Sequence, residues 1–416
     1  MEKLVIVGTG HAASALVSGL ARYQYKGGIA LVGDESHPPY NRPPLSKKFL
    51  GEEMEPSDLY FRSRDQLAAS GIDLHLGDGA AKLDRRAQTV TLASGRSLDY
   101  SNLVLATGSA ARILPVGVDQ TGGRVHVLRN VEDASRLKAE LGMAKTVAII
   151  GAGYVGLEVA ASCSLLGKQV TVMEATSRIL ARVAGNELAD IVQRVHEGHG
   201  VSFRLETTVT RVRAAGDGIA LDLSNGDLLT ADIVLCAIGA VANADLAEAA
   251  GLAVDRRIVT DSRCVTTDNR IYAIGDCAAF LRDGSLLRLE SVQNASDQAD
   301  TVARRICGLE AEYAPLPWFW SDQYDLRLQS VGLATRAEGS IVRTTGNSHA
   351  IWHHREGRII ALDTINAARD HMLARKVLAR GELRMDSLRE VEFDLSRIWA
   401  PPGQRSNAAS SERTMS

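Results

Sequence analysis

The sequence predicts an α/β fold in which one strand–turn–helix unit occurs twice, followed by a smaller α+β domain. Two observations carry this prediction. Apolar residues 4–7 lead into the turn Gly8-Thr9-Gly10-His11-Ala12-Ala13, and apolar residues 147–150 lead into a second turn, Gly151-Ala152-Gly153-Tyr154-Val155-Gly156. A short apolar strand that ends in a glycine turn and continues into a helix is typical of sheets with parallel strands.

Both turns have the spacing of a dinucleotide-binding motif, Gly-x-Gly-x-x-Gly or Ala. The first glycine permits the tight turn, the second lets the backbone approach a pyrophosphate, and the third small residue lets helix and strand pack closely. The N-terminus of the following helix offers N–H groups to phosphates. An acidic residue follows each unit, Asp34 and Glu174, and can accept hydrogen bonds from ribose hydroxyls. We therefore predict two Rossmann-like dinucleotide-binding domains, in a glutathione-reductase-like arrangement. The residues expected at the two dinucleotides are Gly8, Gly10, Ala12, Ala13 and Asp34 in the first unit, and Gly151, Gly153, Tyr154, Val155, Gly156 and Glu174 in the second.

The repeat extends beyond the glycine turns. Residues 89–108 predict a strand, a turn and a second strand that ends in glycine, and residues 221–239 repeat this design. Gly95 and Gly226 are 131 residues apart, whereas Gly8 and Gly151 are 143 apart, so the first copy carries about twelve extra residues. The surplus coincides with the proline-rich loop 37–48, and insertions in a repeated scaffold are places where function tends to reside.

The chain after the second copy indicates a discontinuous first domain. Residues 270–276 predict a strand that delivers Asp276 to a strand end, where α/β sheets bind ligands. Apolar runs beyond the Pro-rich junction at 315–317 predict strands followed by helices. The predicted domains are 1–110 with 241–317, an inserted domain at 111–240, an α+β domain at 318–400, and a Ser- and Asn-rich tail at 401–416 that is expected to be disordered.

Composition excludes several classes of function. The net charge of −3 gives no argument for binding nucleic acid or an anionic membrane. No apolar stretch approaches the roughly 18–20 residues that cross a bilayer. The apolar run at the start reads as the first strand rather than an export signal, so we expect a cytoplasmic protein.

Cysteines and histidines give no metal-binding pattern. The five cysteines, at positions 163, 236, 264, 277 and 307, show no Cys-x-x-Cys spacing, which favours reduced, buried thiols. The pair His196-x-x-His199 lacks an accompanying ligand framework, so we interpret it as a solvated helix end, and His353-His354 in the same way. No metal site is predicted.

The two dinucleotides can be assigned to the two domains. Asp276 supplies a carboxylate suited to a polyhydroxyl chain such as the ribitol of FAD, and the second copy has no counterpart. We therefore assign FAD to the discontinuous domain and the nicotinamide dinucleotide to the inserted one. Glu174 favours NADH over NADPH because a carboxylate repels a 2′-phosphate, although the nearby Arg178 and Arg182 could soften that preference.

Four segments, besides the glycine turns, carry a resemblance to a known family. They are Pro39-Tyr40-x-Arg42-Pro43-Pro44-Leu45-Ser46-Lys47, Ile274-Gly275-Asp276, Glu290-Ser291-Val292-Gln293-Asn294-Ala295 and Trp318-Phe319-Trp320-Ser321-Asp322-Gln323. With these segments, over roughly residues 3–400, the chain resembles the NADH-dependent ferredoxin reductases that serve bacterial oxygenases. One departure is Ala13, where many members have glycine, and we expect no loss of function from it.

The resemblance implies roles at matching positions. Arg42 and Lys47 would lie against the flavin, and Glu158 would pair with Lys47 and face the nicotinamide. Asp276 would hold the ribitol, and Trp320 would cover the flavin. Plainer interpretations stay open. Glu158 could be an ordinary first-turn helix carboxylate, Lys47 a solvated loop lysine and Trp320 a core aromatic. Further residues expected to line the nucleotides are Thr107, Gly108, Ile238, Gly239 and Val292.

The predicted activity is transfer of electrons from NADH through FAD to a [2Fe-2S] ferredoxin. A reductase of rubredoxin or of another small acceptor, such as monodehydroascorbate, shares the architecture. A thiol–disulfide reductase is disfavoured because residues 37–48 contain no cysteine, and a flavoprotein retained for signalling is a third alternative. Arg304 and Arg305, with Arg62 and Arg64, are candidates for docking an acidic ferredoxin, unless each is an ordinary surface charge.

Overall fold

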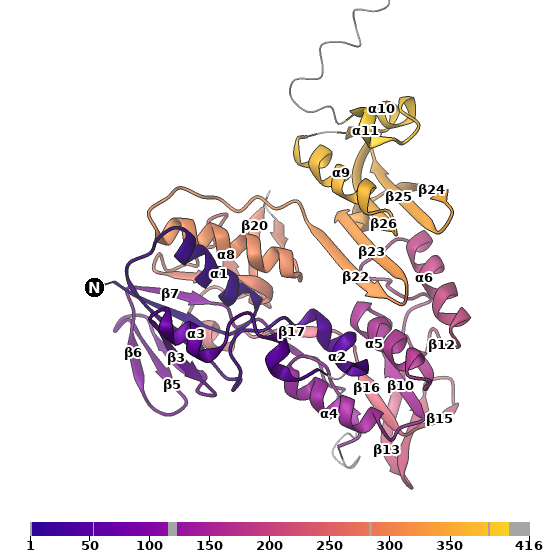
Figure 1. Ribbon diagram of the computed structural model, residues 1–416, viewed down its shortest axis with the longest axis horizontal. Coiled ribbons are helices and arrows are strands. Elements are labelled where there is room, and N and C mark those ends of the chain that lie inside the picture. The colour runs from indigo at the N-terminus through magenta and orange to yellow at the C-terminus, as the bar shows by residue number, and fades with distance from the viewer. Residues whose placement is uncertain (1, 53, 115–122, 283–284, 382, 399–416) are drawn as a thin grey trace, which may run out of the picture. The chain divides into compact units, whose positions relative to one another are not determined.

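The computed structural model describes residues 2–52, 54–114, 123–282, 285–381 and 383–398, drawn in Figure 1. These residues form two compact units. The first combines Met1–Ala175 with His199–Pro315, and the second combines Thr176–Gly198 with the described residues from Leu316 onward. The tail at 401–416, which was expected to be disordered, lies outside the described residues.

The first unit contains a five-stranded parallel sheet built on the first glycine turn. Its strand order is β19-β7-β1-β2-β3, so the strand from beyond the second copy returns to the first sheet. Helices α1 (His11–Arg22) and α8 (Val292–Ile306) lie side by side and share a core with this sheet (Figure 1). The strands are β1 (Lys3–Val7), β2 (Gly28–Gly33), β3 (Ile72–Leu76), β7 (Asn102–Leu105) and β19 (Ile271–Ala273).

A second parallel sheet in the same unit repeats this plan. Its order is β12-β11-β10-β16-β9, and its central strand β10 lies between β11 and β16 as β1 lies between β2 and β7. The predicted duplication is therefore present in the fold. The elements are β9 (Val125–His126), α4 (Val131–Leu141), β10 (Thr146–Ile150), α5 (Tyr154–Leu165), β11 (Gln169–Met173), β12 (Ser202–Arg204) and β16 (Ile233–Cys236).

Each half also carries a three-stranded antiparallel sheet, in which the structure differs from the predicted strand–turn–strand. The turn at Gly95 joins β5 to the short strand β6, whereas the strand that ends in glycine, β7, belongs to the parallel sheet. The second copy does the same at Gly226. Both missed strands are short, three residues in β6 and four in β15, so neither gives a run long enough to show a strand period. The strands are β4 (Ala80–Asp84), β5 (Thr89–Leu92), β6 (Ser97–Asp99), β13 (Val209–Ala215), β14 (Gly218–Leu223) and β15 (Leu228–Ala231).

Short elements complete the first unit. A two-stranded ribbon pairs β8 with β17, and β18, β20 and β21 form a small sheet. The bounds are η1 (Pro43–Ser46), α2 (Lys48–Gly51), η2 (Pro56–Leu59), α3 (Arg64–Ala69), β8 (Ser109–Ala111), β17 (Ala240–Ala242), α7 (Asp245–Ala249), β18 (Ile258–Thr260), η4 (Gly275–Cys277), β20 (Ala278–Arg282) and β21 (Ser285–Leu287).

The second unit is an antiparallel sheet with helices. Its order is β22-β23-β26-β25-β24, with β27 paired to β26, and Trp352 and Leu362 are fully buried in its core. The bounds are α6 (Asn186–Gly198), β22 (Trp318–Gln323), β23 (Leu326–Gly332), η5 (Ala334–Arg336), β24 (Gly339–Thr345), β25 (Ser348–Arg355), β26 (Arg358–Ile365), α9 (Ala368–Ala379), β27 (Leu383–Arg384), α10 (Met385–Glu390) and α11 (Leu395–Ile398). No helix among the described residues is long and apolar enough to cross a membrane.

His196 and His353 belong to this unit and are buried, so the interpretation of solvated positions was wrong for both. His196 on α6 is 0% exposed and its Nε2 donates to Oε1 of Gln323 at 2.8 Å. His353 is buried and its Nε2 lies 2.8 Å from Oδ2 of Asp363. Each imidazole has a polar partner inside the unit, which is how buried polar groups are stabilised.

Candidate active site

The first glycine of each dinucleotide turn is packed against a neighbouring strand end. Gly8 has φ +118°, and a Cβ there would lie 2.1 Å from the carbonyl oxygen of Ala106. Gly151 has φ +103°, and its Cβ would lie 2.5 Å from the carbonyl oxygen of Ala237. A side chain fits neither position. The absence of one lets the backbone of each turn lie against the end of the neighbouring strand, at the carboxyl end of its sheet.

The helices after the two turns begin without side-chain caps. Gly10 and Gly153 are the N-cap residues of α1 and α5, and neither helix has an acidic residue in its first turn. By contrast, Asn130 and Ser291 cap α4 and α8 through their side chains. A Cβ at Gly153 would meet no atom within 4 Å. A glycine N-cap without a side-chain cap leaves the start of each helix open to a pyrophosphate, so the residues present suit a dinucleotide in each half.

The two predicted ribose carboxylates occupy equivalent places. Asp34 follows β2, and its Oδ1 accepts the main-chain N–H of Glu35 at 3.1 Å. Glu174 follows β11, and its Oε2 accepts the N–H of Ala152 in the glycine turn at 2.9 Å. Each carboxylate therefore lies at a strand end beside its dinucleotide turn.

The structure brings Lys47 and Glu158 together. Nζ of Lys47 lies 2.8 Å from Oε1 of Glu158, and the two side chains are 19% and 6% exposed. Oγ of Ser46 donates to the other carboxylate oxygen at 2.5 Å. The loop of the first half and helix α5 of the second half thus share a partly buried charge pair. Burial strengthens such a pair because solvent screens it less.

The loop that carries Lys47 is held on both sides. Its η1 turn begins with two prolines, and Oγ of Ser162 on α5 donates to the carbonyl of Ser46 at 2.9 Å. Leu45 and Phe49 are buried in a small core with Val131 of α4. This packing holds the backbone that carries the lysine.

A second network, of hydrogen bonds and an ion pair, holds the guanidinium of Arg42 in place. Its guanidinium forms an ion pair with Glu35, donates to the carbonyl of Arg129 at 2.9 Å and lies 4.8 Å from the ring centre of Tyr40. The hydroxyl of Tyr40 donates to Glu35 at 2.5 Å. Burial raises the pKa of Tyr40 far above its usual range, so this hydroxyl keeps its proton. Glu35, which sequence reasoning passed over, is the centre of this network.

Asp276 lies in η4, directly after β19. Its Oδ2 accepts hydrogen bonds from Nη2 of Arg129 at 2.9 Å and from Oγ of Ser109 at 3.2 Å. Its side chain is 20% exposed, so the carboxylate remains accessible to a ligand. Neither partner was predicted from the sequence, because Arg129 is 147 positions away and belongs to no motif.

His11, the first residue of α1, is a further polar group at the first turn. Its Nε2 donates to Oδ1 of Asn41 at 3.2 Å, and its ring makes an edge contact with Phe61. Burial lowers the pKa of His11 to about 4, and the nearby Arg42 also lowers it. The imidazole is therefore neutral near pH 7. The sequence analysis did not single out His11, although its position inside the first glycine motif could have indicated a place beside the dinucleotide turn.

The remaining predicted residues lie at strand and helix ends. Oγ1 of Thr107 donates to the carbonyl of Asn243 at 2.6 Å. Gly108 and Gly239 both have positive φ, and Ile238 precedes the latter. The other predicted positions are the first helical residues Tyr154 and Val292, the 44% exposed Val155, and the small residues Ala12, Ala13 and Gly156 packed at the turns. Trp320 belongs to the second unit, where it faces Gln329 on β23 and lies 5.5 Å from Trp318 between ring centres.

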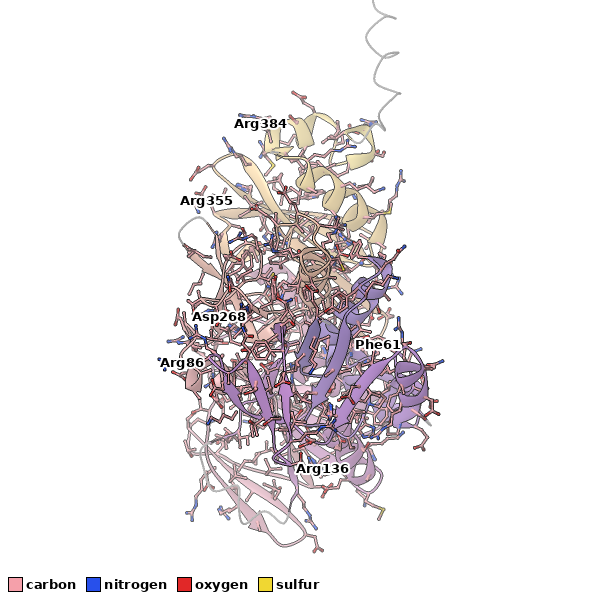
Figure 2. All side chains as sticks on the ribbon, turned by 90° about the vertical axis from the view of Figure 1, so that its left-hand side faces the viewer. Phe61, Arg86, Arg136, Asp268, Arg355 and Arg384 are labelled. Carbon is pink, nitrogen blue, oxygen red and sulfur yellow. The ribbon has the colours of Figure 1, made fainter. Side chains whose placement is uncertain are left out.

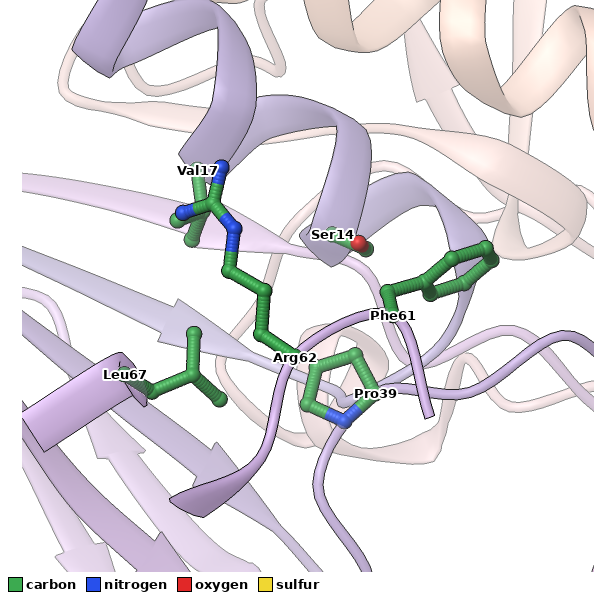
Figure 3. A pocket seen from close by; sticks show the side chains of 6 residues that line it. All are labelled: Ser14, Val17, Pro39, Phe61, Arg62 and Leu67. Carbon is green, nitrogen blue, oxygen red and sulfur yellow. The ribbon is translucent and has the colours of Figure 1, made fainter. Parts of the chain in front are cut away.

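A small pocket lies beside α1 (Figure 3). It is lined by Ser14, Val17, Pro39, Phe61, Arg62 and Leu67, of which Arg62 is a predicted docking residue and none is a predicted cofactor or catalytic residue.

The other docking candidates differ in exposure. Arg304 is exposed, with Nε 2.8 Å from Oδ2 of Asp300. Arg305 is only half-buried, and its guanidinium contacts the carbonyl of Ala311 and the hydroxyl of Tyr272. Arg64 donates to the carbonyl of Ser36. Arg304 is therefore the better candidate for a contact with a partner.

Two glycine turns of the dinucleotide-binding type lie in one compact unit and are joined by a charge pair, an arrangement typical of a two-nucleotide oxidoreductase. Residues 2–299 match the family described as pyridine nucleotide-disulphide oxidoreductase, and residues 318–399 match the reductase C-terminal domain. The chain belongs to the pyridine nucleotide-disulphide oxidoreductase family. Its fold class, its nature as a flavoprotein oxidoreductase and its use of FAD and NAD(H) were predicted from the sequence and are confirmed.

Individual relatives extend over nearly the whole chain. Rhodocoxin reductase of Rhodococcus erythropolis is 39% identical, covering 94% of this chain and 93% of the relative. Ferredoxin–NAD(P)(+) reductase of a Sphingomonas species is 38% identical, covering 96% of this chain and 98% of the relative. The crystal structure of a covalent putidaredoxin reductase–putidaredoxin complex has a TM-score of 0.91 and 35% identity, covering 95% of this chain and 98% of that one.

Proposed function

We propose that this protein passes electrons from NADH through FAD to a [2Fe-2S] ferredoxin that serves a bacterial oxygenase. The observation that carries the proposal is the Lys47–Glu158 ion pair, which joins the loop after the first dinucleotide turn to the helix after the second. A pair at this junction can hold the reacting ends of the two cofactors in register. The FAD that these residues would hold would supply a group able to exchange both electron pairs and single electrons, which suits a two-electron donor and a one-electron acceptor.

The side chains act by position and charge. Lys47 and Arg42 would lie against the flavin, and Glu158 would orient Lys47 while facing the nicotinamide. Asp276 would bind the ribitol hydroxyls, and Trp320 would cover the flavin. The reaction needs no side-chain base, because close alignment of two rings is sufficient for the transfer from NADH.

The acceptor is inferred from relatives and from cysteine positions. Relatives named as ferredoxin reductases, and a relative solved in complex with putidaredoxin, support a small protein partner. The sequence contains no cysteine before Cys163, so the loop that carries Lys47 has no disulfide to reduce. A rubredoxin acceptor is the second candidate, because rubredoxin-NAD(+) reductase of Pseudomonas putida is 35% identical over 87% of this chain.

The nicotinamide preference follows from Glu174. A carboxylate that already accepts the Ala152 N–H lies where a ribose would bind, and it would repel the 2′-phosphate of NADPH. We assign NADH to residues 111–240 and FAD to residues 1–110 with 241–317. The return of β19 to the first sheet supports this division.

Ferredoxin docking is assigned to the exposed Arg304 on α8, with Arg305 beside it. A cytoplasmic location is proposed as well, since all five cysteines are free thiols, as expected in a reducing compartment.

The test is anaerobic stopped-flow mixing of the holoprotein with one equivalent of NADH, then with oxidised [2Fe-2S] ferredoxin. Rapid bleaching of the flavin band by NADH, followed by ferredoxin reduction and flavin reoxidation, is the expected result. Bleaching without transfer to ferredoxin, but with transfer to rubredoxin, would move the acceptor to the second candidate. Absence of bleaching by either NADH or NADPH would overturn the proposal.

A further inference from the structure

Gln298 on α8 is 1% exposed and accepts a hydrogen bond from the turn that carries Asp276. Its Oε1 lies 2.7 Å from the main-chain nitrogen of Gly275, the residue before Asp276. A buried main-chain N–H needs an acceptor, and here a side chain supplies it instead of a neighbouring strand.

The turn at Gly275 has little room for movement. Gly275 has φ +78°, and a Cβ there would lie 3.2 Å from Cβ of Ala12 on α1 and 3.9 Å from Cβ of Ala295 on α8. Gly275 opens η4, and its N–H lies in the peptide plane that it shares with Ile274. The next peptide plane leads to Asp276, so the direction of this N–H and the position of Asp276 are coupled through the φ and ψ angles of Gly275 alone.

A chain of hydrogen bonds fixes the orientation of the Gln298 amide. Nδ2 of Asn294 donates to Oε1 of Gln298 at 3.3 Å and to the carbonyl of Leu289 at 3.0 Å. Oδ1 of Asn294 accepts from the hydroxyl of Tyr313. Asn294 and Tyr313 are each 4% exposed. Because the Leu289 carbonyl can only accept and the Gly275 N–H can only donate, the two amides have one satisfied orientation, which presents the oxygen of Gln298 to Gly275.

The carboxylate of Asp276 is oriented from its other side by Arg129 and Ser109. Gln298 thus fixes the main chain and these two residues fix the side chain. We propose that Gln298 is a positioning residue that sets where the Asp276 carboxylate meets the ribitol hydroxyls of FAD. This inference rests on the role assigned to Asp276 in the proposed function.

A double-mutant cycle on the full-length holoprotein tests the inference. The measured quantity is the dissociation constant of FAD for Gln298→Met, for Asp276→Asn and for the double variant. Each single change should raise the constant about tenfold. The double variant should bind FAD no more weakly than Asp276→Asn alone, because Gln298 acts through that carboxylate. The circular dichroism of the flavin band should change in the same direction in both single variants.

Thr301→Val is the matched control on the same helix. Thr301 is 6% exposed, but its Oγ1 donates only within α8, to the carbonyl of Asp297 at 3.0 Å. This variant should leave the FAD dissociation constant unchanged. If Gln298→Met does not fold, Tyr313→Phe removes one hydroxyl from the same chain and should give about a twofold to threefold rise with the same non-additivity.

Three outcomes would overturn the inference: additive effects in the double variant, an equal effect of Thr301→Val, or an Asp276→Asn variant that binds FAD normally. The last would also remove the role of Asp276. Transfer of electrons from NADH to ferredoxin is measured separately by stopped flow, so the proposed reaction could stand after any of the three.

Discussion

Nζ of Lys47 lies 2.8 Å from Oε1 of Glu158, although the two residues belong to different copies of the duplicated fold. The lysine is the C-cap of η1 in the proline-rich loop of the first copy, and the glutamate lies in the first half of α5 in the second. Because Ser46 satisfies the other carboxylate oxygen, the glutamate has a defined rotamer. The extra residues of the first copy thus form a link between the two copies of the fold.

Glu158→Gln tests this link. Without the negative charge, Lys47 loses its partner and its position, so flavin reduction by NADH should slow about tenfold to a hundredfold. FAD should remain bound, because Glu158 belongs to the second copy. Anaerobic stopped-flow absorbance of the flavin band measures the rate.

Ser46→Ala is the matched control for that variant. It removes the hydrogen bond to Oε2 but leaves the ion pair, so the rate should fall less than about threefold. Equal rates in Glu158→Gln and the unsubstituted protein would assign the ion pair to structure alone.

Glu174→Ala should change the choice of nicotinamide cofactor. Removing the carboxylate removes its repulsion of the 2′-phosphate, so the ratio of kcat/KM for NADPH to that for NADH should rise about tenfold. Steady-state reduction of ferricyanide measures both values. Asp34→Ala is the control, since Asp34 lies at the equivalent strand end of the other copy. A change in the ratio for Asp34→Ala, with none for Glu174→Ala, would exchange the two cofactor assignments.

The fold was largely predictable because its determinants are local. Each central strand is an apolar run that ends in a glycine turn, and both runs form the centre of a parallel sheet. Helix α6 shows the limit of that reasoning. Its apolar face indicates burial, but nothing in its sequence says that it packs in one compact unit with the C-terminal sheet. The burial of His196 against Gln323 follows from that packing and was therefore missed.

Residues of the candidate site divide in the same way. Lys47, Glu158 and Asp276 lie in recognisable segments, so they could be named from the sequence. The residues that orient these three side chains could not be named from the sequence. Arg129 bonds to Asp276 from 147 positions away, and Gln298 bonds to the main chain of Gly275, a contact that depends on backbone geometry. Long-range orientation is set by the folded structure and leaves no local pattern.

Arg304→Glu should weaken docking of ferredoxin. The exposed guanidinium would be replaced by a charge that repels an acidic partner, so the KM for ferredoxin should rise about threefold to tenfold, and less at high salt. Activity with NADH and ferricyanide should not change. The ion pair with Asp300 is exposed and contributes little to stability. Arg305 is left intact, because its contacts with Tyr272 and Ala311 would mix stability with docking.

The control for that variant is Arg86→Glu, which makes the same change of charge on the exposed turn after β4 (Figure 2). It should leave the KM for ferredoxin unchanged. An equal rise in both variants would show a general charge effect and remove Arg304 from the docking surface.

His371 makes the second unit sensitive to acid. Its side chain is 3% exposed, and burial, with Arg375 nearby, lowers its pKa from 6.5 to about 4. Between these two pKa values His371 is therefore protonated in the unfolded chain and neutral in the folded chain. Stability is fully present above pH 6.5 and falls as the pH drops toward 4, by up to about 3 kcal/mol. His371→Leu should cost about 1 kcal/mol near neutral pH, through the lost hydrogen bond to the Ser330 main chain, yet exceed the unsubstituted protein in stability near pH ~4.5. Urea unfolding followed by tryptophan fluorescence is the suitable measurement, because all four tryptophans lie at or after Trp318. Parallel loss of stability with acid in both proteins would show that His371 does not carry the effect.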